Sequence, residues 1–484
     1  MAVLEHLKPA LVWKHFEGLC NIPHPSGHEE GVAKYIQEQA KRLGYPVERD
    51  EVGNVKVTQP ATPGHEKAPT VVLQGHMDMV GVCVEGSGHD FLTDPIRPKI
   101  EDDYVRAQDT TLGADNGVGV AMMLAVMDDG DVVHPELEHL FTINEEAGMD
   151  GAHGLKAEFL KGRRLINLDT EEFGEFYISC AGGNDSIVKL ATPRAPADKS
   201  ASTLAVKVGG LKGGHSGTDI NLGRGSATKI LARLLDRALD AAPLRLRSVE
   251  GGSKRNSIAE KASAVLDVDA GSVDAVQKAI DERAAEIKAE LEKDDPGLAV
   301  SVSKTDPEGP DPMTAGISKT AVKLLVALPH GVLAMSPEVP GLVETSTNVG
   351  TIETSDEGIR SVNLTRSAVT SSLEMMKERI RAIAGFAGAE VEEPRGYPGW
   401  KPDMDSELLK KGKEVYKSLF GKDPEVKAIH AGLECGIFSE TLKGVDMISV
   451  GPTMRNVHSP AEECYIPHVE EMHKLLGKYL EALA

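Results

Sequence analysis

The sequence is short of cysteine, aromatic residues and positive charge. Its five cysteines include no C-x-x-C pair, which argues against a disulfide framework and indicates reduced thiols. Aromatic residues make up 4% of the chain beside 49 glycines, a balance typical of a loop-rich α/β enzyme and unlike a β-sandwich. Lys and Arg number 53 against 75 Asp and Glu, so the net charge of −22 predicts no nucleic-acid partner.

Long apolar runs and nucleotide-binding motifs are also missing. No apolar run is long enough to cross a bilayer, and the start MAVLEHLKPALVWKHF lacks the apolar core of a signal peptide. No P-loop is present, and no G-x-G-x-x-G follows a predicted strand. We therefore expect a cytoplasmic protein with no membrane partner.

The length of 484 residues is too great for one ordinary core and predicts two domains, or one domain with an insertion. Strand and helix patterns alternate up to AGGND near Asp185, which predicts an α/β fold with a mixed sheet between layers of helices. Three strand–helix units follow, and the first pattern returns after GYPGW. We expect a catalytic domain in 1–185 and 395–484, with an α+β lid inserted at 186–394.

Two helix starts are indicated by polar residues. Ser26 and Glu29 have the spacing of a capping box, and the helix that follows should close at Gly44. A second helix should begin at Asp115 and, being apolar nearly all round, should be buried.

Acids and histidines recur just after predicted strands, where open α/β sheets gather their ligands. They are His76 and Asp78, Asp115 with Asn116, Glu145 and Glu146, Asp169, and His458. Taken singly, each has an ordinary explanation, such as a hydrogen-bonded surface pair, a helix cap or a solvated turn. Gathered on one rim, so many carboxylates would repel one another without a cation. Two divalent ions about 3.5–4 Å apart that share a bridging carboxylate would neutralise them.

Five motifs in this order resemble the metal motifs of the co-catalytic di-zinc exopeptidases, the family that includes carboxypeptidase G, peptidase T and carnosinase. They are GHMDMV, TLGADNGVG, NEEAGMDGA, NLDTEE and GPTMRNVHSP. IPHPSGHEEGVA, GLKGGHSGTDI, KRNSIA and HAGLECGIF further resemble the subgroup of cytosolic aminoacyl-histidine dipeptidases. The likeness spans nearly the whole chain and is weakest near 273–309.

The resemblance implies a role for each residue of the rim. Asp115 would bridge both metals, His76 and Asp169 would complete one shell, and Glu146 and His458 the other. Asp78 would hold the ring of His76 through its second nitrogen. Glu145 would be the general base. Ligands of imidazole and carboxylate without thiolate fit Zn²⁺, for which Mn²⁺ or Co²⁺ can substitute.

The resemblance also implies residues that contact the substrate. His215 in GGHSG corresponds to a lid histidine that reaches the oxyanion, in many relatives across a dimer interface. Arg366 and Asn256 correspond to a pair that binds a free carboxylate, for which an Arg fork is suited. Asn348 is expected to assist them. Glu434 lies where relatives contact substrate, although it would equally suit a helix cap.

These features predict a metal-dependent dipeptidase with a di-metal-bridged hydroxide, acting on unsubstituted dipeptides that include Xaa-His. A homodimer through the lid is expected, but an enlarged lid would let His215 act within one chain. Two alternatives stay open: an N-acyl amino-acid deacylase or tripeptidase with the same metals, and a non-catalytic protein that kept the fold. The second is disfavoured because Glu145 and every ligand are present.

Overall fold

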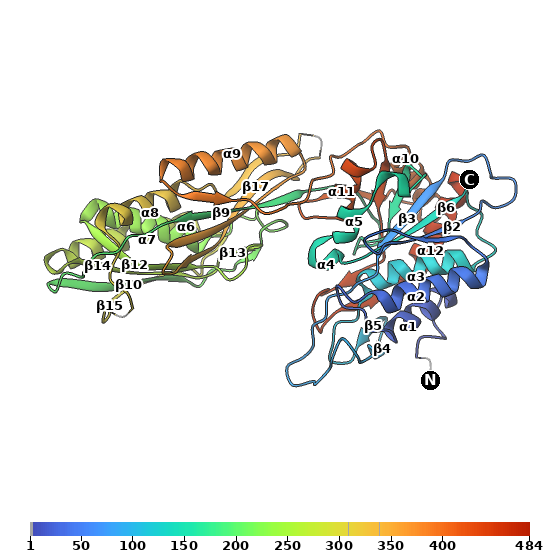
Figure 1. The fold of residues 1–484 in the computed structure, drawn as a ribbon, viewed down its shortest axis with the longest axis horizontal. Helices are drawn as coiled ribbons and strands as arrows, with labels where there is room; N and C mark the ends of the chain where they lie inside the picture. The colour runs from blue at the N-terminus through green and yellow to red at the C-terminus, as the bar shows by residue number, and fades with distance from the viewer. Residues whose placement is uncertain (1–2, 308, 338) are drawn as a thin grey trace. The chain divides into compact units, whose positions relative to one another are not determined.

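The computed structural model describes residues 3–307, 309–337 and 339–484 (Figure 1). The chain divides into two compact units. The first holds the chain up to Cys180, Trp400–Ala428 and Leu433–Ala484, and the second holds Ala181–Gly399 and Ile429–Gly432. The sequence placed the borders at 185/186 and 394/395, and it did not indicate that residues 429–432 return to the second unit.

The first unit is built on a mixed sheet with the strand order β1-β2-β6-β3-β7-β21-β8-β20. Its strands are β1 (Val47–Arg49), β2 (Val55–Gln59), β3 (Val71–His76), β6 (Leu137–Thr142), β7 (Arg164–Asn167), β8 (Glu175–Cys180), β20 (Glu425–Ile429) and β21 (Asp446–Ser449). Strand β3 pairs in parallel with β6 and β7, and β21 pairs in parallel with β7. The carboxyl ends of these four strands therefore share one edge of the sheet.

Helices cover both faces of this sheet, as the α/β prediction requires. Val71 and Leu73 belong to the hydrophobic core on one face, whereas Val72, buried between them, faces the other way. The helices that contribute to this core are α1 (Ala10–Cys20), α2 (Glu30–Leu43), α3 (Ala114–Asp128), α10 (Glu407–Phe420) and α12 (Ile466–Leu483). Figure 1 shows α1, α2 and α3 side by side. The remaining helices of the unit are α4 (Glu145–Gly148), α5 (Asp150–Gly154), the 3₁₀ turn Ala157–Phe159, and α11 (Glu434–Thr441).

A smaller antiparallel sheet completes the first unit and carries the last predicted ligand between two of its strands. Its strands are β4 (Pro98–Glu101), β5 (Tyr104–Ala107), β22 (Met454–Arg455) and β23 (Glu463–Tyr465). His458 lies in the loop that joins β22 to β23.

Both predicted helix starts differ in detail from the structure. Helix α2 begins at Glu30, and no side chain caps it, so the capping box predicted for Ser26 is wrong. Its end is as expected, because Gly44 adopts the left-handed conformation there. Helix α3 is buried throughout its length, as predicted, but Asp115 and Asn116 have non-helical backbone angles.

The second unit is a long antiparallel sheet with the strand order β15-β10-β14-β12-β17-β18-β9-β19, and β16 pairs with β17. Its strands are β9 (Gly182–Leu190), β10 (Ala201–Gly209), β12 (Leu244–Gly251), β14 (Ala262–Asp269), β15 (Ala299–Lys304), β16 (Gly331–Met335), β17 (Val343–Thr354), β18 (Ile359–Ser367) and β19 (Glu390–Glu392). Helices α6 (Ala227–Ala241), α7 (Val273–Glu290), α8 (Ala315–Ala327) and α9 (Thr370–Phe386) lie on one face of it (Figure 1). A 3₁₀ turn, Ala270–Ser272, precedes α7, and the short strands β11 (Gly214–His215) and β13 (Ser257–Ile258) pair separately.

Two expectations about the whole chain can be compared with the structure. All five cysteines are free thiols, as their spacing indicated. Across the residues that the structure describes, every helix is too short or too polar to pass through a lipid bilayer.

Candidate metal centre

Strand β3 ends at His76, on the rim where the carboxyl ends of the parallel strands meet. Asp169 follows the neighbouring strand β7, and its Oδ1 lies 3.3 Å from Nε2 of His76. Gly75 lets α3 approach β3 closely, because a Cβ at this position would lie 2.3 Å from Oδ1 of Asn116. The side-chain amide of Asn116 in turn donates to the carbonyl of Leu168, next to Asp169. The start of α3 is thereby fixed against the ends of both strands.

Asp115 lies between the two predicted metal positions and turns one oxygen toward each. Its Oδ1 is 3.2 Å from Nε2 of His76, and its Oδ2 is 3.2 Å from Nε2 of His458. Three groups of described residues have their ligand atoms within 4.8 Å of one another. Two of them share Asp115, namely His76, Asp115 and Asp169, and Asp115, Glu146 and His458, and the third is His76, Glu145 and Glu146. A carboxylate shared in this way is what a bridging ligand between two cations requires.

Glu146 and His458 form the second group from opposite ends of the sequence. Oε1 of Glu146 lies 2.8 Å from Nε2 of His458. The segment between β21 and β22, which leads to the loop of His458, closely approaches the chain just after β7 at Gly451, where a Cβ would lie 1.8 Å from the carbonyl of Thr170. Only glycine permits this approach, which explains why GPTM precedes the histidine.

The centre is rich in negative charge and short of positive charge. Burial raises the pKa of Asp169 to about 6, with Asp115 and Glu146 adding to the effect and His76 opposing it. Burial also disfavours the ionised form of Asp115, but hydrogen bonds with His458 and His76 outweigh it and lower its pKa. Hydrogen bonds to Asp115 and Glu146 raise the pKa of His458 to about 11. Oδ1 of Asp169 is buried and has no hydrogen-bond partner among the described residues. A pair of divalent cations fits this donor set, because it would neutralise the acids and occupy the unpartnered oxygen.

Glu145 begins the short helix α4, directly before Glu146. Burial raises its pKa well above the usual range for a glutamate, and the carboxylates of Asp169, Glu146 and Glu434 act in the same direction. Asn144, which precedes it, has a left-handed backbone with φ of 53° that turns the chain out of β6. A carboxyl group whose pKa is raised in this way is suited to exchange protons near neutral pH.

Asp78 has a wider role than the one expected of it. Nδ1 of His76 donates to the backbone carbonyl of Asp78 at 3.0 Å, and the carboxylate of Asp78 lies further away, at 3.5 Å. The carboxylate accepts hydrogen bonds mainly from the backbone N–H groups of Glu145, at 2.9 Å, and Glu146, at 3.2 Å. Asp78 therefore orients His76 chiefly through its backbone, while its side chain holds the start of α4.

Two residues that the sequence predicted to cap a helix instead support the metal centre. The hydroxyl of Ser26 donates to Oδ2 of Asp78 at 2.8 Å, in place of capping α2. Glu29 is 6% exposed, and its Oε1 accepts hydrogen bonds from the backbone N–H groups of Gly27 and Asn144. Ser26 and Glu29 of the S-x-x-E motif therefore stabilise the loop around Glu145 and do not cap a helix.

Glu434 is fully buried at the first position of α11. Its Oε2 accepts hydrogen bonds from Nε2 of Gln74, at 2.6 Å, and from the hydroxyl of Thr142, at 2.8 Å. Burial raises its pKa to about 8. Its Oε1 has no hydrogen-bond partner among the described residues, so the predicted contact with substrate concerns this oxygen.

In the second unit, His215 and Arg366 of one chain face each other. Nη2 of Arg366 lies 3.4 Å from Nε2 of His215. The backbone N–H of Thr218 donates to Nδ1 of His215, so the proton of the neutral ring is on Nε2. Burial and the charge of Arg366 lower the pKa of His215 and favour this neutral form. The two side chains therefore lie side by side, and their N–H groups would suit neighbouring anionic groups of a substrate.

Asn256 and Asn348, both predicted to contact substrate, lie on either side of one loop. The carbonyl of Asn256 accepts a hydrogen bond from the N–H of Ser216, beside His215, and its side chain is exposed. Asn348 is 1% exposed, and its Nδ2 donates to the carbonyls of Arg255, at 3.1 Å, and Ser257, at 2.9 Å. Asn348 thus holds the loop that presents Asn256, and its predicted part in binding the substrate stays a prediction.

The sequence did not single out two neighbours of Arg366. Its Nη1 donates to the hydroxyl of Tyr397 at 3.0 Å. His430, in the short segment that returns to the second unit, hydrogen-bonds through Nε2 to the hydroxyl of Ser346 at 2.7 Å. Burial, followed by the charge of Arg366, lowers the pKa of His430 to about 3. Both residues lie in motifs noted above, GYPGW and HAGLECGIF, but no spacing marks them as partners of an arginine.

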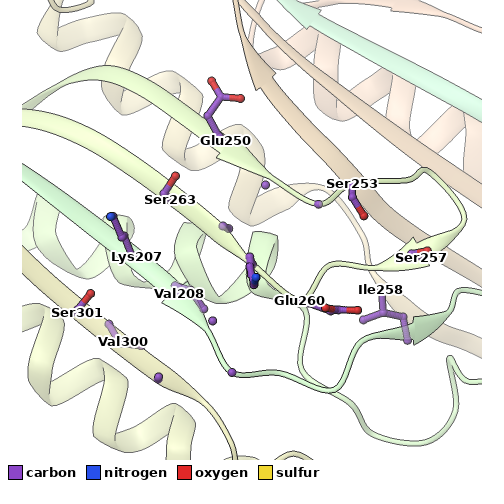
Figure 2. A pocket seen from close by; sticks show the side chains of 17 residues that line it. Lys207, Val208, Glu250, Ser253, Ser257, Ile258, Glu260, Ser263, Val300 and Ser301 are labelled. Atoms are coloured by element: carbon purple, nitrogen blue, oxygen red, sulfur yellow. The ribbon is translucent and has the colours of Figure 1, made fainter. Parts of the chain in front are cut away.

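Cavity size does not locate the candidate site. A cavity of about 770 Å³ lies beside β10, β14 and the loop after β12 (Figure 2). Its described lining mixes Lys207 and Lys261 with Glu250 and Glu260, and it includes none of the predicted metal ligands. The chemistry of the donor set, and not the volume of a pocket, identifies the centre.

Comparison with known sequences gives a clear family match. The sequence model described as Peptidase family M20/M25/M40 matches residues 72–482. The chain is 41% identical to a protein named cytosol non-specific dipeptidase from Escherichia coli over 483 residues, which cover 100% of this chain and 99% of that protein.

Solved structures agree with this match. The crystal structure of aminoacylhistidine dipeptidase from Vibrio alginolyticus has a TM-score of 0.92 and 40% identity, and covers 99% of this chain and 98% of its own. That of aminopeptidase PepT from Bacillus cereus has a TM-score of 0.57 and 17% identity, and covers 99% of each chain. The second likeness concerns the fold alone.

Proposed function

Because the chain belongs to peptidase family M20/M25/M40, we propose that it hydrolyses the peptide bond of unsubstituted dipeptides with the help of two divalent cations. The observation that carries the proposal is the position of Asp115, whose two oxygens each face a different histidine at 3.2 Å. The names of two relatives about 40% identical to this chain, both dipeptidases, support the choice of substrate.

Five side chains would hold the two cations. Asp115 would bridge them, His76 and Asp169 would complete one site, and Glu146 and His458 the other. Bound there, the cations would polarise the substrate carbonyl and make a water molecule acidic enough to lose a proton near neutral pH. Zn²⁺ suits a set of imidazole and carboxylate ligands, and Mn²⁺ or Co²⁺ would substitute for it.

Glu145 would carry the proton through the reaction. In its ionised form it takes the proton of the attacking water and then delivers a proton to the leaving amine. Asp78 keeps Glu145 in place, because its carboxylate accepts the N–H of Glu145 at 2.9 Å. His76, with its Nδ1 donating to the carbonyl of Asp78, presents Nε2 toward the cation site.

The family resemblance assigns the donors for the negatively charged parts of the substrate to His215, Arg366 and Asn256. Nε2 of His215 would donate to the oxygen that becomes negative when the carbonyl is attacked. Arg366, assisted by Asn256, would bind the free carboxylate of the dipeptide, and Asn348 would hold the loop of Asn256. Because His215 and Arg366 of one chain are only 3.4 Å apart, we propose that they act together within that chain.

Glu434 would distinguish a free amino group from an acylated one. Its unpartnered Oε1 is an acceptor for an ammonium group, and its position near Glu145 is reflected in the raised pKa of that residue. An N-acyl amino acid would leave Oε1 without a donor, a loss that binding sites discriminate strongly. This feature favours the dipeptidase over an N-acyl amino-acid deacylase on the same metal site.

The location and assembly of the protein also belong to the proposal. We infer a cytoplasmic enzyme from the name of the Escherichia coli relative, and a homodimer through the second unit from the family resemblance. Small peptides are the expected partners.

Three substrates with the metal-loaded protein test the proposal: a dipeptide, its N-acetylated form and a tripeptide. Cleavage of the dipeptide alone, abolished by a chelator and restored by Zn²⁺ or Mn²⁺, is the expected result. Preferred cleavage of the acetylated form or of the tripeptide would replace the dipeptidase with one of the two alternatives.

A further inference from the structure

Glu462 is a buried carboxylate that receives hydrogen bonds from four consecutive backbone N–H groups. It is 2% exposed and lies four residues after His458. Its bonds come from Leu112 at 2.8 Å and Gly113 at 3.2 Å, both to Oε2, and from Ala114 at 2.8 Å and Asp115 at 3.3 Å, both to Oε1. Both of its oxygens are thus used by one stretch of backbone.

This stretch of backbone is the one that carries the bridging ligand. The first N–H groups of a helix have no partner within the helix, and the backbone of Asp115 is itself non-helical. The helix therefore does not fix the position of Asp115, whereas Glu462 binds the N–H of Asp115 and of each of the three residues before it. The four N–H groups also compensate the negative charge of Glu462, which would otherwise be costly to bury.

The same residue belongs to the loop that carries His458. The backbone N–H of Glu462 donates to the carbonyl of Ser459 at 3.0 Å, and Glu462 directly precedes β23. The side chain of Glu462 therefore connects the loop of His458 to the loop of Asp115, although His458 and Asp115 are 343 positions apart in the chain.

We propose that Glu462 is a positioning residue, which sets the place of the Asp115 carboxylate relative to His458 and thereby the affinity of the centre for its second cation. The inference rests on the di-metal site proposed above. Gln at this position keeps the shape, but its amide N–H₂ would point at two of the four N–H donors. The loop would then shift away from the place where Asp115 serves both ligand groups.

Metal binding by the full-length protein tests this inference without use of the reaction. Metal-free wild type and E462Q are titrated with Co²⁺, and uptake is followed by visible absorption. E463Q is the matched control, because Glu463 is the adjacent residue and pairs with Arg106, away from the four N–H groups. Wild type and E463Q should each take up two equivalents. In E462Q, one equivalent should bind about 10- to 100-fold more weakly, and the absorption spectrum at saturation should change.

The outcomes separate this inference from the function proposed above. Two equivalents bound by E462Q with wild-type affinity and spectrum would overturn the role of Glu462 alone. Fewer than two equivalents in the wild type would overturn the di-metal site and this inference together. If E462Q does not fold, E462D takes its place, since it keeps the charge but places it one methylene group further from the loop. Wild-type affinity in E462D would then refute the inference.

Discussion

His215 and Arg366 are predicted to serve the same active site from the same chain. The prediction follows from the 3.4 Å between Nη2 of Arg366 and Nε2 of His215, which places the two side chains of one chain next to each other. In an enzyme that exchanged His215 but not Arg366 between subunits, the two residues of one chain would belong to different sites. Complementation between two inactive variants distinguishes the two arrangements.

The expected activities follow from counting intact sites. H215A should lose about 10²- to 10³-fold in kcat/KM, the usual effect of removing a donor to the oxyanion. R366A should also lose activity, because the carboxylate of the substrate loses its charged partner. If His215 acted across a dimer while Arg366 acted in its own chain, a mixed dimer of the two variants would have one intact site of two, and the purified mixed dimers would show about half of wild-type activity. If His215 acts within its own chain, no combination of the two variants contains an intact site, and nothing is restored.

The assay uses co-expressed variants with two different affinity tags, so that mixed dimers are purified through both tags and tested with a dipeptide. The matched control pairs the wild type with the double variant H215A/R366A. Within-chain action predicts one working site in this control, whereas exchange predicts none. Restored activity in the H215A–R366A mixture together with an inactive control would refute the within-chain arrangement.

Three further predictions concern single residues. E145Q should lower kcat by about 10²- to 10⁴-fold while two metal equivalents still bind by titration, and dipeptide cleavage at the wild-type rate would contradict its role as base. E434Q should raise KM for an unsubstituted dipeptide more than KM for its N-acetylated form, and equal effects on both would remove Glu434 from amine recognition. His139 is buried, and burial lowers its pKa from 6.5 to about 3. Below about pH 6.5 the unfolded chain therefore takes up a proton at this residue, and the folded chain does not. The free energy of unfolding should decrease by about 1.4 kcal/mol for each unit by which the pH is lowered between about 6.5 and 3. In urea unfolding of the metal-free protein, H139N should lose less stability than wild type between pH 7 and pH 5, and an equal loss in both would contradict the assignment.

Much of the first unit was predictable because its residues follow simple periodicity. The aliphatic run before His76 forms a buried parallel strand, and the apolar pattern after Asn116 forms a helix buried on all sides. Parallel strands place their carboxyl ends on one edge, so the convergence of His76, Glu146 and Asp169 follows from the order of the elements.

What the sequence did not reveal depends on contacts between distant residues. Ser26 and Glu29 have the spacing of a local helix cap, but their hydrogen-bond partners are Asp78 and Asn144. A hydrogen bond between residues far apart in the chain leaves no periodic pattern in the sequence. Glu462 is equally hidden, since an acid near the end of an exposed-looking loop gives no sign that it binds four N–H groups.

The way the acids of the centre are held explains why the positive charge is left for cations to supply. Asp78 is held by the N–H groups of Glu145 and Glu146 and by the hydroxyl of Ser26, and Glu434 is held by an amide and a hydroxyl. Such neutral donors fix a carboxylate without cancelling its charge, so the negative potential accumulates on the rim. A lysine or arginine would cancel it, but would also fill the space where the substrate carbonyl must lie. Two small cations would neutralise the same charge and would leave coordination positions open for water and substrate, so the proposed chemistry would depend on this surplus of acids.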